Sequence, residues 1–98
     1  MNQFIIDIDI HEERILDFFA LIPDQRDQIN KLISEGRISS VTLSSDRQKM
    51  WITMFGSSEE NIISILNTFV LIKSMDYKIT QLMFHISNTQ FFPQLFLN

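Results

Sequence analysis

The sequence contains no cysteine, and glycine and proline occur only twice each in 98 residues. Without a thiol the chain forms no disulfide, has no thiolate nucleophile and offers no cysteine ligand to zinc or an iron–sulfur cluster. Few glycines and prolines, 45% hydrophobic residues and 20% charged residues exclude a disordered or low-complexity chain. The composition therefore predicts a packed globular protein, and the length allows one domain.

Positive charge is scarce as well, because eight Lys and Arg residues face twelve Asp and Glu residues, for a net charge of −4. Nucleic-acid binding depends on clustered basic residues, and here they are scattered, so we expect no nucleic-acid partner. No apolar run reaches the roughly 20 residues that span a bilayer, and the N-terminus lacks the basic start of a signal peptide. We expect no membrane association and a cytoplasmic location.

Hydrophobic periodicity predicts the element order β-α-β-β-α-β. Strands are expected at 3–10, 38–45, 49–55 and 76–84, and helices at 12–21, at 23–35 and after 57. Pro23 suits the first turn of a helix, and Gly36 suits a helix end. Ser57 and Glu60 have the spacing of a capping box at the start of the last helix.

This order predicts an α+β fold, namely a ferredoxin-like split β-α-β domain over residues 1–86 with both helices on one face of an antiparallel sheet. A domain of this size has a thin margin of stability, so we expect a homodimer or a higher homo-oligomer. Residues 87–98 form an apolar tail, which we expect to dock on its own domain or on a partner subunit. Its apolar residues are Phe91, Phe92, Leu95, Phe96 and Leu97.

Alternation along the strands assigns each side chain to one face of the sheet. Ile6, Ile8 and Met50 fall on the helix side. The opposite face, which we call the open face, receives a mixture of polar and apolar residues. It includes Asp7, Thr42, Trp51, Thr53 and Lys78. Such a mixture suits the lining of a cavity between two facing sheets, where a small organic ligand would bind.

The segment at 69–85 reads Phe-Val-Leu-Ile-Lys-Ser-Met-Asp-Tyr-Lys-Ile-Thr-Gln-Leu-Met-Phe-His. It resembles the closing segment of the muconolactone isomerase family, where a Leu-Pro-Leu-Phe stretch leads to Met, an acidic residue, an alternating strand and a His. The likeness extends loosely over most of the chain. It departs from the family at Val70 and Lys73, where proline is typical, and at Lys78, where an acidic residue is often found. The resemblance implies ferredoxin-like subunits whose sheets pair into a dimeric α+β barrel, and isomerisation of a small lactone or carbonyl compound in its cavity without a cofactor.

Asp7 and Asp9 lie on one strand face with carboxylates about 6–7 Å apart, a separation at which they could act as general acid and base. In an isomerase, Asp7 would be the base, and Lys78, Thr42 or Thr53 would donate to the enolate-like oxygen. The alternative is structural: Asp7 pairs with Lys78 across neighbouring strands, and Asp9 is solvated.

Other candidates carry similar alternatives. His85 matches the histidine of the family and lies near the cavity mouth or serves a structural role. Trp51 stacks on a planar ligand or packs across a dimer. His11 beside two glutamates suggests a surface turn rather than a metal site. Two functions therefore remain open: an isomerase-like enzyme, and a non-catalytic dimeric module that binds a small molecule or assembles.

Overall fold

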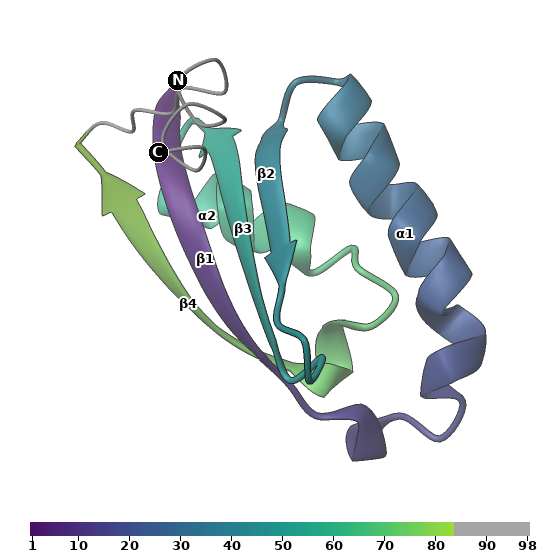
Figure 1. Ribbon diagram of the computed structural model, residues 1–98. Coiled ribbons are helices and arrows are strands. Elements are labelled where there is room, and N and C mark those ends of the chain that lie inside the picture. Colours follow the sequence, from purple (N-terminus) through teal and green to yellow (C-terminus); the bar gives the residue numbers. More distant parts are fainter. Residues whose placement is uncertain (84–98) are drawn as a thin grey trace, which may run out of the picture.

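The structure, a computed structural model, describes residues 1–83 (Figure 1). Its elements are β1 (Asn2–Ile10), the 3-10 turn η1 (Glu12–Arg14), α1 (Phe18–Ser34), β2 (Ile38–Leu43), β3 (Lys49–Gly56), α2 (Glu59–Leu66), η2 (Ile72–Ser74) and β4 (Met75–Leu82). The strands form one antiparallel sheet in the order β2-β3-β1-β4. The predicted β-α-β-β-α-β order and the ferredoxin-like fold are thereby confirmed.

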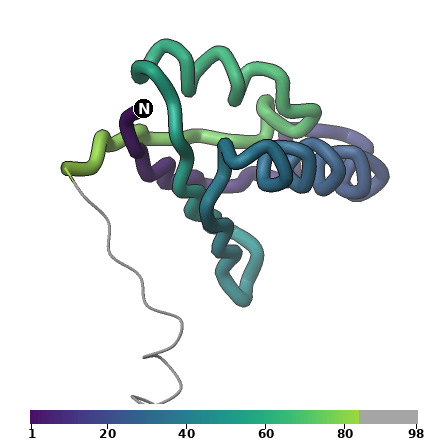
Figure 2. Tube along the Cα trace, turned by 90° about the horizontal axis from the view of Figure 1, so that it is seen from above, coloured from purple at the N-terminus to yellow at the C-terminus, as the bar shows by residue number. Residues whose placement is uncertain are grey.

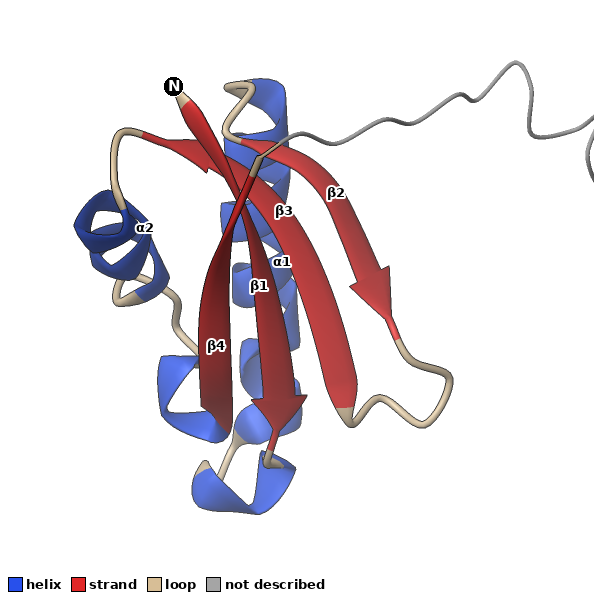
Figure 3. Cartoon of the chain, turned by 90° about the vertical axis from the view of Figure 1, so that its left-hand side faces the viewer, coloured by secondary structure: helices blue, strands red, loops and turns tan. Residues whose placement is uncertain are grey.

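The core lies between the sheet and the two helices, and Figure 3 shows α1 behind the sheet. Phe4, Ile6 and Ile8 alternate along β1 and are at most 1% exposed. Alternation places these side chains on the helix face of the pleated strand, where they meet Ile62 and Leu66 of α2 in one apolar cluster. The predicted division of the strands between a helix face and an open face is therefore confirmed.

The predicted pair of helices at 12–21 and 23–35 is wrong at their boundary. A single helix, α1, runs from Phe18 to Ser34 and contains Pro23, and only the short turn η1 precedes it. Proline removes one helical hydrogen bond, here the one to the carbonyl of Phe19, and this costs least close to the start of a helix. Ile22 and Ile29, which precede and follow Pro23 in the helix, pack against the same core, so burial outweighs the lost bond.

The helix α2 begins one residue later than the capping box at Ser57 predicted. Ser58 is the N-cap, and its hydroxyl accepts a hydrogen bond from the backbone N–H of Asn61 at 3.1 Å. The helix ends at Leu66, and Phe69 enters the core from the turn that follows.

Two predictions fall beyond the described residues. His85 and the apolar tail at 87–98 both follow residue 83. Within residues 1–83, no helix has the length and apolar character needed to cross a membrane.

Candidate functional site

The open face holds the predicted site residues in a row that crosses all four strands. Thr42 of β2 pairs with Trp51 of β3, Trp51 pairs with Asp7 of β1, and Asp7 pairs with Lys78 of β4. In an antiparallel sheet, directly paired residues point to the same face. Four of the residues predicted from the alternation therefore lie side by side.

The two other described candidates lie in the neighbouring rows. Thr53 pairs with Ile5 of β1 and is only 4% exposed. Asp9 pairs with Lys49 on one side and with Asp76 on the other. The open face therefore has a charged half around Asp9 and a more apolar half beyond Thr53.

Lys49 is the basic partner of both aspartates. Its Nζ lies 3.1 Å from Oδ1 of Asp7 and 2.9 Å from Oδ1 of Asp9. The predicted ion pair between Asp7 and Lys78 is wrong, because no such pair forms among the described residues, and Asp9 is not simply solvated. Lys49 stands directly opposite Asp9 and diagonal to Asp7, so one ammonium reaches both carboxylates.

These contacts hold the pKa of Lys49 above its ordinary value, first through the hydrogen bond with Asp9 and then through that with Asp7. The ammonium therefore stays charged through neutral pH, and it also lies 5.8 Å from the centre of the Trp51 ring. The sequence analysis gave Lys49 no role. The missing information was the hairpin register, which decides which lysine faces the two aspartates.

The apolar half of the open face consists of part-buried side chains from three strands. Gln3 pairs with Phe55 of β3 and with Leu82 of β4, and Ile5 occupies the next row. These residues share the face of Trp51, away from both helices. Among the described residues, no helix covers this face.

A separate polar cluster ties η1 to β4. Arg14 donates two hydrogen bonds to Asp76, at 2.7 and 3.0 Å, and Nε2 of His11 lies 3.1 Å from the same carboxylate. The hydrogen bond from Arg14 is the main cause that lowers the pKa of Asp76 below its ordinary value. Because the cluster fixes η1, which precedes α1, to β4, it indicates a structural role. Among the residues described here, no three His, Asp or Glu side chains are grouped so that they could hold a metal ion.

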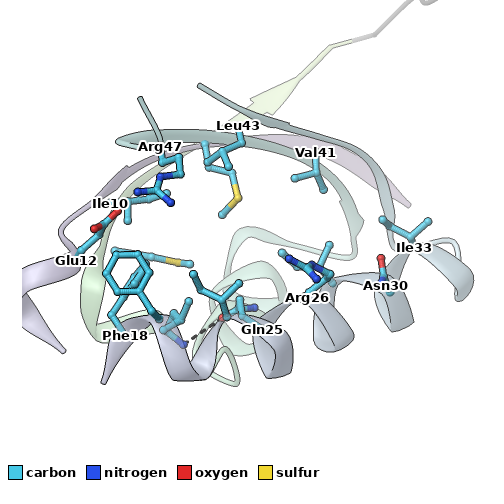
Figure 4. A pocket seen from close by; sticks show the side chains of 16 residues that line it. Ile10, Glu12, Phe18, Gln25, Arg26, Asn30, Ile33, Val41, Leu43 and Arg47 are labelled. Carbon is cyan, nitrogen blue, oxygen red and sulfur yellow. Dashed lines mark hydrogen bonds between the residues drawn. The ribbon is translucent and has the colours of Figure 1, made fainter. Parts of the chain in front are cut away.

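A second candidate site, which the sequence did not predict, lies between α1 and the β2–β3 hairpin (Figure 4). It is an open cavity of about 370 Å³ with mostly apolar walls. The apolar lining consists of Ile10, Phe18, Phe19, Ile22, Ile29, Ile33, Val41, Leu43, Met50, Leu71 and Met75. The sequence shows that these residues are apolar, but its hydrophobic periodicity does not show that α1 stands away from the edge strand β2.

Gln25 is the buried polar residue of this cavity wall. It is 5% exposed, and its Oε1 accepts a hydrogen bond from the backbone N–H of Leu71 at 3.1 Å. Its Nε2 is buried without a hydrogen-bond partner in residues 1–83. A buried amide donor without a partner carries a free-energy cost.

No protein-family model matches the sequence, and no curated protein matches it. Among solved structures, the crystal structure of MtbAldR is similar, with a TM-score of 0.52 and 10% sequence identity. The similarity covers 89% of this chain, which spans 57% of that chain. At this identity the likeness shows the fold alone, a ferredoxin-like α+β arrangement.

Proposed function

We propose that this protein is a non-catalytic module that assembles by pairing the open face of its sheet with that of a second copy. The observation that carries the proposal is the character of this face, on which Trp51, Phe55 and Leu82 lie part-buried in a surface that no described helix covers. Removing the exposed parts of such aromatic and aliphatic groups from water lowers the free energy, so burial against a partner is favourable.

The charges of the open face suit a two-fold pairing. Asp7 and Asp9 lie on the central strand β1, while Lys49 and Lys78 lie on the strands to either side of it. A two-fold axis brings the same patch of two subunits together, so acidic and basic rows of one copy can meet their opposites in the other. The described surface is thus compatible with itself both in charge and in apolar content.

The same contacts support an assembly role more than an isomerase. A general base needs a free lone pair aimed at the proton it removes. Asp7 instead shares the ammonium of Lys49 with Asp9, and the contact of 3.1 Å occupies one of its carboxylate oxygens. The ion pairs thus give Asp7 a structural task that requires no substrate.

The test is the Phe55→Lys variant, which places a charge in the apolar half of the open face. We expect the wild type to be a dimer or a larger oligomer by light scattering after size-exclusion chromatography. The variant should weaken the association at least about tenfold, because it buries an unpaired charge at the interface. Val70→Lys is the matched control, since Val70 is an exposed apolar residue outside the sheet, and it should leave the oligomer unchanged.

Two results would overturn this proposal. A wild type that is monomeric at all working concentrations removes the assembly. Turnover of a small lactone that Asp7→Asn abolishes, with the circular dichroism spectrum unchanged, replaces the non-catalytic module with an isomerase.

A further inference from the structure

The walls of the cavity come from α1 and β2, whose apolar side chains do not pack fully against one another. Phe19 of α1 is 57% exposed and Ile33 is 47% exposed, while Val41 and Leu43 of β2 are 37% and 51% exposed. In Figure 4 the labelled side chains of the helix and of the hairpin point from opposite sides into a common space. Apolar groups that face each other across open space make a site for an apolar body of matching size.

The polar groups of the cavity are mainly hydrogen-bond donors. Arg26 and Arg47 bring their guanidinium groups to the lining. Within residues 1–83, Glu12 is the one carboxylate of that lining, and Asn30 adds a neutral amide. An occupant that complements this set brings acceptor oxygens and negative charge.

Both arginines are available to such an occupant. Within residues 1–83, no ion pair or side-chain hydrogen bond engages the guanidinium of Arg26 or of Arg47. Arg47 instead lies over the ring of Phe19, 5.7 Å from its centre, and so spans the space between the hairpin and α1. A carboxylate would gain charge-assisted hydrogen bonds from these groups.

We infer that this cavity binds a small organic monocarboxylate, with its apolar body between α1 and β2 and its carboxylate at the guanidinium of Arg26. The volume of about 370 Å³ lies at the lower end of the roughly 300–1,000 Å³ usual for ligand sites, so a medium-length or single-ring acid fits. The site shares no residue with the open face. It is therefore independent of the assembly proposed above, and either can fail without the other.

The experiment is an amide NMR titration of the full chain with decanoate below its micelle concentration, and with decan-1-ol as the uncharged probe. We expect saturable shifts at the Gln25 side-chain amide and at the backbone amides of Val41 and Leu71. Decanoate should bind at least about tenfold more tightly than decan-1-ol, because only the acid pairs with a guanidinium.

Two variants separate the charge from the space. Arg26→Gln should remove most of the preference for decanoate over decan-1-ol, whereas Lys31→Gln, on the same helix but outside the cavity lining, should leave it unchanged. Val41→Phe should fill the cavity and weaken both probes at least about tenfold. Val41 is part-exposed on an edge strand, so this variant should keep the fold, which circular dichroism checks.

Three results would overturn the inference. Absence of shifts at the cavity residues up to the solubility limit shows that there is no site. Equal affinity for decanoate and decan-1-ol, unaffected by Arg26→Gln, shows that no carboxylate is recognised. Contacts in the free full chain between the rings of Phe91 or Phe92 and Val41, seen as nuclear Overhauser effects, show that the occupant is the tail of the chain itself.

Discussion

The two helices cover the same face of the sheet, but only one of them seals it. On the α2 side, Ile62 and Leu66 are fully buried, and the backbone of Gly56 approaches so closely that an added Cβ would lie 2.7 Å from Cδ1 of Ile62. On the α1 side, a helix of 17 residues buries only Phe18 and Gln25. The longer helix is the more loosely packed one, and Figure 2 shows it lying beyond the β2 edge of the sheet.

Polar contacts from glutamine side chains position α1 where apolar burial does not. Nε2 of Gln28 donates to the carbonyl of Thr68 at 2.7 Å, and its Oε1 accepts from the N–H of Val70 at 3.0 Å. Gln25 accepts from the next N–H along the same loop, that of Leu71. The amides fix α1 to the loop after α2 and leave its other side facing the cavity. The contrast with α2 shows that polar contacts on one side of a helix can fix its position while the apolar groups on its other side remain open to a ligand.

The most direct test of this difference in packing is to truncate a large aliphatic side chain on each helix. Leu66→Ala on α2 should lower the free energy of unfolding by about 2–5 kcal/mol, since a fully buried side chain leaves a cavity in the core. Ile33→Ala on α1 should change it by less than about 1 kcal/mol, because Ile33 is half-exposed and alanine is the better helix former. Urea unfolding followed by circular dichroism measures both. Equal losses would show that α1 is packed as tightly as α2.

The close approach at Gly56 gives a second, smaller test of the α2 side. Gly56→Ala should cost about 1–3 kcal/mol, because the new methyl group overlaps Ile62. Ile62→Val removes Cδ1, the nearest of the atoms that the new methyl group overlaps, so the double variant should lose less than the sum of the single variants in thermal unfolding.

Gly36→Ala, at the end of α1, is the matched control. Apart from its chain neighbours, no residue in the described range 1–83 lies within 4 Å of the added Cβ, and the φ of +75° makes backbone strain, about 1–2 kcal/mol, the main cost. Ile62→Val should not relieve it. Additive losses at Gly56 and Ile62 would contradict the tight contact.

Sequence reasoning was sufficient for the sheet and insufficient for the contacts between elements. Period-two alternation is a local property of each strand, so Asp7, Trp51 and Lys78 could be placed on one face in advance. Which lysine reaches Asp7 depends on register and on side-chain reach across strands. The cavity depends on the distance between α1 and β2, which a hydrophobic period does not encode. The single helix through Pro23 was missed for the same reason, since its core contacts outweigh a local signal.

The smallest expected effect concerns the exposed contact between Arg14 of η1 and Asp76 of β4. The pKa of Asp76 is lowered, mainly by its hydrogen bond from Arg14, so the ionised carboxylate favours the folded state. This contribution is present above the unfolded pKa of about 3.8 and is lost as the pH falls through the lower folded value. Asp76→Asn should therefore unfold at a slightly lower temperature than the wild type at pH 6, and the two melting curves should converge well below pH 3.8. Asp17→Asn, which caps no helical N–H with its side chain, should show no such convergence. If the difference in melting temperature between Asp76→Asn and the wild type persists unchanged at low pH, the charge of Asp76 is not its cause. Packing, and not the contact with Arg14, would then hold the start of α1.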